Sequence, residues 1–252
     1  DKFINQTSFP MRSSTRSHIS ILRDFLKGNP QARPSKTIPV QPCAPTGIEG
    51  DKQAKIVWLG HSAFYLEIAG KKLLLDPMFS MYPSPFPPFG GKRFSERPVN
   101  IDDLPDIDVV LLSHDHYDHL DFKTIIKLKD RGKQFHVPLG VGDHLLRWGI
   151  EPNKIYNHDW WEEYRLDELL LVCTPAQHFS GRTLHKQNKT LWASWVILSE
   201  DAKIFFSGDG GYGYHFQVIG KKYGPFDVTL MECGQYDKRW KAIHMMPEET
   251  VQ

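Results

Sequence analysis

Three histidines and three aspartates are packed into the nine residues Ser113–Asp121, directly after the apolar run Ile107–Leu112. The apolar run predicts a buried strand. Because side chains alternate faces along a strand, His114 and His116 are expected to point the same way and to grip one ion from one side. A polar loop whose histidines merely cap the following helix is the alternative.

The second half of this run predicts a second metal position beside the first. A helical pattern follows Asp121, which is its expected N-cap, and Gly132 is expected to end the helix. The turn into this helix would carry Asp118 and His119 to the other flank of the same pocket. Imidazoles with a little carboxylate suit zinc or a similar borderline metal. A structural zinc site would more typically recruit thiolates, and none lies nearby in the sequence.

Two further apolar runs end close to residues that can bind metal. Leu169–Thr174 ends shortly before His178, and Lys203–Ser207 leads into Asp209. Ligands gather at the ends of strands in sheet-based domains, so these residues are expected to meet the histidine-rich run. The glycines around Asp209 are interpreted as room for the backbone to approach the metals.

The histidine-rich run resembles the signature of the metallo-β-lactamase-fold hydrolases. Four other segments are similar to the branch that contains N-acylphosphatidylethanolamine-hydrolysing phospholipase D and its bacterial relatives: Trp58–Phe64, Leu75–Ser80, Thr174–Arg182 and Phe206–Tyr212. The likeness extends from about Lys55 to the last residue. It implies an α/β fold, a four-layer αββα sandwich.

The resemblance also implies two divalent metal ions, expected to be zinc, with manganese or iron as alternatives. The first ion would be held by His114, His116 and His178, and the second by Asp118 and His119. Asp209 would bridge the two ions. A bridging water with a pKa lowered towards neutrality is the predicted nucleophile. The family's further histidine on the second ion comes from beyond the helix that begins at Pro247, and no residue here matches it.

Two residues are predicted to be catalytic: Asp118, as a ligand of the second ion, and His244, which would orient or protonate the leaving group. A histidine that only marks the entry to the next helix is the alternative for His244. Asp115 and Asp121 are the first candidates to hydrogen-bond the ligand imidazoles. Three further histidines are interpreted as structural or surface residues: His136, His144 and His158. For His61, at a strand junction, a role in the pocket or in supporting a ligand is left open beside a purely structural one.

The chain is predicted to divide into residues 1–54, an N-terminal arm with a proline-rich connector, and residues 55–252, the hydrolase domain. Apolar residues at helical spacing in the arm predict either a packed helix or a membrane-surface helix flanked by basic residues: Ile19, Leu22, Phe25 and Leu26. The helix that starts at Pro247 would have a single turn before Gln252, so the domain is expected to be truncated at its C-terminus.

A long loop, Pro77–Pro98, is rich in aromatic residues and is predicted to be ordered. It would either wall a groove for an acyl chain or form a lid that covers the core. The predicted substrate-binding residues are Phe79 and Tyr82 in this loop, and Tyr236 in the segment that resembles the family's substrate side.

The composition limits the partners. A net charge of +1 offers no general attraction to polyanions, so a nucleic-acid partner is not expected. Three scattered cysteines argue against a disulfide framework. A small-molecule or lipid substrate is predicted, with peripheral membrane contact and homo-oligomerisation left open. The compartment also stays open, with the cytoplasm favoured over the periplasm.

The predicted function is a metal-dependent phosphodiesterase of the phospholipase D type that acts on N-acylphosphatidylethanolamine-like lipids. One alternative keeps the fold and the metals and cuts small lactones or esters. A second alternative is a non-catalytic scaffold that binds metal as a structural element.

Overall fold

The computed structural model describes residues 2–7, 20, 23–24, 27–28, 34–43, 54–84, 91–183, 186–234 and 236–252. The apolar residues of the predicted arm helix lie outside these ranges, as do Phe86 and Phe89 of the aromatic loop. In the described part, no helix combines the length and apolar character that spanning a bilayer requires. Cys43, Cys173 and Cys233 are free thiols, as the scattered spacing predicts.

The first sheet has six strands that follow one another in chain order. They are β1 (Lys55–Gly60), β2 (Ala63–Ile68), β3 (Lys71–Leu75), β4 (Ile107–Leu111), β5 (Gly132–Pro138) and β6 (Ile155–His158). The first three pair antiparallel and the rest are parallel. Ala69 and Gly70 both have positive φ, which closes the tight turn between β2 and β3.

The second sheet has five strands in the order β11-β10-β9-β8-β7. They are β7 (Glu163–Leu166), β8 (Leu169–Pro175), β9 (Ala193–Leu198), β10 (Lys203–Phe206) and β11 (Val228–Leu230). Only β10 and β11 are parallel, and the connection between them contains helix α4 (Tyr214–Tyr223). A parallel pair needs such a crossover, since a tight turn would reverse the chain direction.

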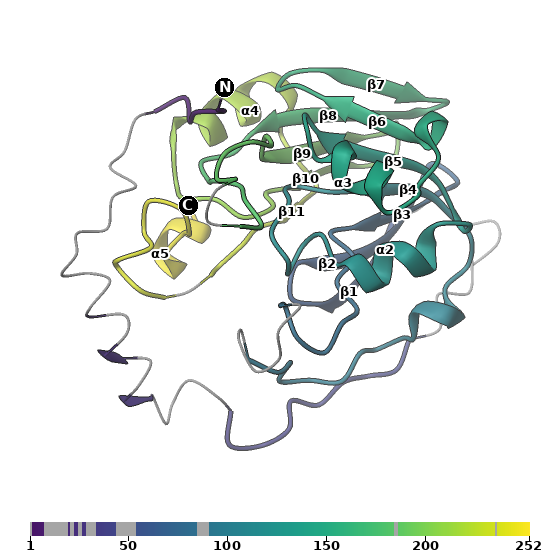
Figure 1. The fold of residues 1–252 in the computed structure, drawn as a ribbon. Coiled ribbons are helices and arrows are strands. Elements are labelled where there is room, and N and C mark those ends of the chain that lie inside the picture. Colours follow the sequence, from purple (N-terminus) through teal and green to yellow (C-terminus); the bar gives the residue numbers. More distant parts are fainter. Residues whose placement is uncertain are drawn as a thin grey trace.

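The two sheets pack face to face, and helices cover both outer faces (Figure 1). Helices α2 (Phe122–Leu128) and α3 (Gly142–Arg147) pack on the first sheet, and α4 packs on the second. Strand β4 is apolar on both sides because Val110 faces the helices while Val109 and Leu111 face the other sheet. The predicted four-layer αββα sandwich is therefore confirmed.

Short elements complete the sandwich, and one predicted boundary is wrong. These elements are the 3-10 turns η1 (Ile101–Asp103) and η2 (Pro152–Lys154), and the one-turn helix α5 (Pro247–Thr250), which begins at the predicted proline. Asp121 caps α2 as predicted, with its carboxylate accepting from the Lys123 amide. Gly132 does not end that helix; it begins β5, where a side chain would collide with the Phe135 ring.

His136 and His158, predicted to be structural or surface residues, form a buried pair away from the histidine-rich loop. The His136 Nδ1 and His158 Nε2 atoms lie 2.9 Å apart, and the His136 ring stacks on Tyr156. Burial, with a smaller effect of the neighbouring His158, lowers the pKa of His136 to about 3. His136 is therefore neutral in the folded chain under ordinary conditions.

This burial predicts a loss of stability in acid. Between pH of about 6.5 and 3 the unfolded chain binds a proton that folded His136 excludes, so the free energy of unfolding falls as the pH is lowered, by up to about 1.4 kcal/mol per pH unit. Urea unfolding of the wild type and His136→Phe across this window would measure it. The variant should have the shallower slope, and parallel curves would contradict the assignment.

Candidate metal centre

The C-terminal ends of β4, β8 and β10 bring the predicted ligands together. The loop after β4 carries His114, the segment after β8 carries His178, and the loop after β10 carries Asp209. His114, His116 and His178 form one group able to hold an ion, and Asp209 lies beside His178 in another. Residues nearly one hundred positions apart thus meet at one edge, as the strand pattern predicts.

Three imidazoles form the first position. His114 Nε2 lies 2.8 Å from His116 Nδ1, which lies 3.3 Å from His178 Nε2. Nitrogen ligands at about 2.1 Å from a tetrahedral metal are separated by about this distance. Burial, reinforced by neighbouring imidazoles, holds the pKa of His114 and of His178 well below 6.5, so their lone pairs are free to bind a metal.

A second group able to hold an ion consists of His61, Asp118 and His119, and the predicted bridging residue Asp209 lies beside it. His119 Nε2 lies 3.2 Å from one Asp209 oxygen and 3.9 Å from one Asp118 oxygen. This nitrogen is buried and makes no hydrogen bond of good geometry within the described structure. An orphaned imidazole nitrogen facing two carboxylates is the arrangement expected around a divalent cation. The residues present therefore fit a pair of divalent ions.

Partners outside the ligand set orient the rings. Ser113 Oγ lies 2.9 Å from His114 Nδ1, and His178 Nδ1 lies 3.0 Å from the Ile243 carbonyl oxygen that it can donate to. The prediction of Asp115 and Asp121 for this role is wrong. Asp115 accepts from the Gly181 amide and faces His144, while Asp121 caps α2, so neither carboxylate hydrogen-bonds a ligand ring within the described structure.

Asp76, at the end of β3, is the functional residue that sequence reasoning missed. Its fully buried carboxylate accepts from the Ser113 amide at 2.7 Å and from the Ser113 hydroxyl, and lies 2.7 Å from His119 Nδ1. It thereby orients the His119 ring directly and the His114 ring through Ser113. The signal was present, since Asp76 follows an apolar strand just as Asp209 does.

Glycines let loops approach one another closely at this edge, and the interpretation that they make room for the metals stays a prediction. Gly208 has a φ of 56°, and a Cβ on it would lie 2.6 Å from the Ser113 Cβ. A side chain at Gly211 would collide with the Ala242 carbonyl, next to the Ile243 carbonyl that receives His178. Both glycines thus make room for the chain that supports the ligand rings.

The N-terminal segment also reaches the site. The Asn5 amide nitrogen donates to the His178 carbonyl at 2.7 Å, and its oxygen accepts from the His178 amide at 3.1 Å. The same oxygen accepts from Trp192 Nε1 at 3.1 Å. Asn5 therefore fixes the backbone of a predicted ligand from the other end of the chain.

A cavity of about 650 Å³ opens beside the second position. Asp118, Asp209 and His244 lie in its wall, together with an apolar set formed by Trp58, Phe64, Phe94, Phe206, Leu230 and Met231. His244 Nδ1 lies 3.5 Å from a Glu232 oxygen. Burial lowers the pKa of His244, but Glu232 and Asp209 outweigh it and the pKa is raised.

The predicted substrate-binding residues do not line this cavity. Phe79 is 4% exposed and packs in the core, and its contact with substrate stays a prediction, as does the choice between a groove wall and a cover over the core. Tyr82 is half-buried and Tyr236 is 75% exposed, and their contact with substrate stays a prediction. Among the described residues of that loop, Phe94 is the aromatic one that lines the cavity.

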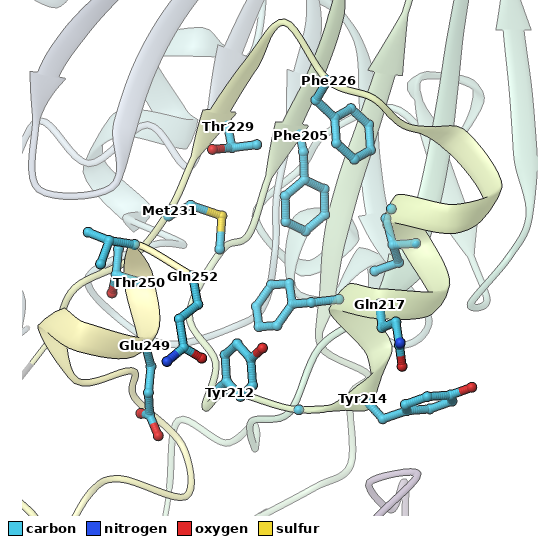
Figure 2. A pocket seen from close by; sticks show the side chains of 15 residues that line it. Phe205, Tyr212, Tyr214, Gln217, Phe226, Thr229, Met231, Glu249, Thr250 and Gln252 are labelled. Carbon is cyan, nitrogen blue, oxygen red and sulfur yellow. The ribbon is translucent and has the colours of Figure 1, made fainter.

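A larger cavity of about 960 Å³ lies on the outer side of the second sheet (Figure 2). Its lining includes Phe205, Phe226 and Tyr212, together with Glu249 and Gln252 from the last residues of the chain. It contains none of the predicted ligands. The smaller cavity is therefore the better candidate for chemistry, since Asp118, Asp209 and His244 line it.

Residues 71–252 match the family described as the beta-lactamase superfamily domain. An uncharacterized protein of Mycobacterium tuberculosis is 41% identical over 99% of this chain and 67% of its own length. N-acyl-phosphatidylethanolamine-hydrolyzing phospholipase D 1 of Caenorhabditis elegans is 33% identical over 86% of this chain, which spans 64% of that protein. Among solved structures, a metallo hydrolase of Ignicoccus hospitalis superposes with a TM-score of 0.58 at 22% identity, covering 79% of this chain and 76% of its own.

Proposed function

The chain belongs to the beta-lactamase superfamily, as a metal-dependent hydrolase, and from that premise we propose that it is a phosphodiesterase of the phospholipase D type. Its proposed substrates are N-acylphosphatidylethanolamine-like lipids. The observation that carries the proposal is the apolar wall of the 650 Å³ cavity, which adjoins Asp118 and Asp209. Such a wall suits the chains of a lipid, whereas a small polar lactone would leave it unfilled.

His114, His116 and His178 are proposed to hold the first ion, and Asp118 and His119 the second, with Asp209 between them. When bound, two divalent ions, proposed to be zinc, would supply a water of lowered pKa and positive charge opposite the phosphoryl oxygens. The three carboxylates around His119 support this assignment, because they concentrate negative charge where cations would balance it.

In the proposed reaction the oxygen of water bonds to phosphorus, and the bond from phosphorus to the N-acylethanolamine oxygen breaks. The products are phosphatidic acid and an N-acylethanolamine, whose oxygen leaves with a proton. His244 is proposed to hand over that proton, since it lines the cavity and its Nδ1 lies 3.5 Å from a Glu232 oxygen. No serine, cysteine or lysine nucleophile is required.

We expect the zinc-loaded chain to release phosphatidic acid from N-acylphosphatidylethanolamine in mixed micelles, and His116→Ala to lower the rate by about 10²–10³-fold or more. His144→Gln, which changes a histidine outside the ligand groups, is the matched control and should stay near the wild-type rate. Chelation should abolish release, and adding back zinc, manganese or iron separately would identify the active metal.

Product no greater than that of His116→Ala would refute the lipid phosphodiesterase. Rapid hydrolysis of small lactones or esters in the same preparation would then support the alternative substrates on the same fold. Absence of any hydrolysis, with full metal content, would favour the scaffold.

A further inference from the structure

The turn between β1 and β2 holds a histidine in an unfavourable backbone conformation. Gly60 and His61 have φ of 91° and 52°, and residues other than glycine rarely adopt the second value. The pairing of Gly60 with Ala63 makes His61 and Ser62 the two central residues of the turn. Trp58 Nε1 donates to the His61 carbonyl at 2.7 Å and ties the turn back to its own strand.

Arg93 braces this turn from outside. Its guanidinium donates to the Leu59 carbonyl and to the Met78 carbonyl, each at 2.7 Å. A side chain at Gly60 would occupy the place of that guanidinium, so the glycine is required for the brace. The position of His61 is therefore fixed by strand β1, by Arg93 and by the segment that contains Met78. This is more support than a simple surface turn needs.

The braced turn places the His61 ring against the second metal position. His61 Nε2 lies 3.1 Å from an Asp118 oxygen, and the His61 ring centre lies 5.3 Å from that of His119. Within the described part of the chain, His61 makes the only hydrogen bond to the Asp118 carboxylate. This carboxylate is 32% exposed at the edge of the cavity and would otherwise turn freely.

We infer that His61 is a positioning residue for the second metal position: its Nε2–H donates to Asp118 and holds that carboxylate in the orientation that binds the ion. The inference rests on the two-ion site of the proposed function. A ligand carboxylate held by a hydrogen bond loses less rotational freedom when the ion binds, so the affinity for that ion is higher.

Titration of the metal-free 252-residue chain with Zn²⁺ by calorimetry tests this directly. His61→Asn should weaken binding of the second equivalent by about 10–100-fold and leave the first equivalent unchanged. Asparagine tolerates the positive φ, but its amide is too short to reach Asp118. His61→Gln is the matched variant, because its longer side chain can return the donor to the place of Nε2 and should restore most of the affinity.

Three outcomes would overturn the inference. If both variants bind two equivalents as the wild type does, His61 has no part in the site. If Gln fails to rescue while both variants unfold at the wild-type urea concentration, and Co²⁺ spectra lose a nitrogen ligand, His61 binds the ion itself. If the wild type takes up only one equivalent of Zn²⁺, the two-ion site is wrong, and both the proposed function and the inference about His61 fail. The first two outcomes overturn only the inference and leave the proposed function standing.

Discussion

Replacing Asp209 with asparagine is expected to lower kcat by at least about 10²–10³-fold and to remove one of the two ions. One Asp209 oxygen lies 3.2 Å from His119 Nε2 and 3.9 Å from His244 Nδ1. Burial raises the pKa of Asp209, but His119 and the other imidazoles outweigh it and hold it well below its usual range, so the side chain carries a full negative charge. Asparagine keeps the shape and loses that charge.

Metal content by mass spectrometry and hydrolysis of the lipid substrate would be measured on the same preparations. Asp201→Asn is the matched control, because this aspartate is exposed in the turn before β10 and its change should leave both measurements unaltered. If the Asp209 variant keeps two ions and its activity, the proposed arrangement of the ions around this carboxylate is wrong.

Asp76→Asn should have the largest effect on stability. The fully buried carboxylate accepts hydrogen bonds from the Ser113 amide, the Ser113 hydroxyl and His119 Nδ1. In asparagine the NH₂ group is a donor, so it would face at least one of these three donors in place of an acceptor. Leaving buried donors unpaired is expected to lower the free energy of unfolding by about 2–5 kcal/mol. The affinity for the second ion should fall by about 10–100-fold, since the His119 ring loses its support.

Urea unfolding of the metal-free chain separates the stability effect from the effect of metal binding. Asp108→Asn, in the neighbouring strand β4, is the control: its carboxylate pairs with exposed Lys133 and with the Lys72 amide, so its loss should cost about 1 kcal/mol. Equal unfolding midpoints for the two variants would show that Asp76 does not hold this loop.

The ligand groups could be predicted because their signal is local. Apolar runs such as Ile107–Leu111 predict buried strands, and the polar residues that follow are then expected at one edge of the sheets. Asp76 obeys the same rule after β3. It was missed because it is a single aspartate before a proline, and its importance depends on contacts with the separate segment that contains Ser113 and His119.

Other parts of the site could not be predicted, for physical reasons that differ. The acceptor for His178 is a backbone carbonyl, that of Ile243, and carbonyls leave no trace in a sequence. Phe79 and Phe94 sit in the same aromatic loop, yet one packs in the core and the other lines the cavity. Both environments favour large apolar side chains, so only the folded chain distinguishes them.

The hydrogen bonds from Asn5 to His178 have a practical bearing on how this protein can be dissected. A chain that begins at residue 55, where the proline-rich composition gives way to strands, would lack these hydrogen bonds to the backbone of a predicted metal ligand. Asn5 thus supports a predicted metal ligand from a distant part of the sequence, so a low metal content in the shortened chain would reflect the loss of this contact.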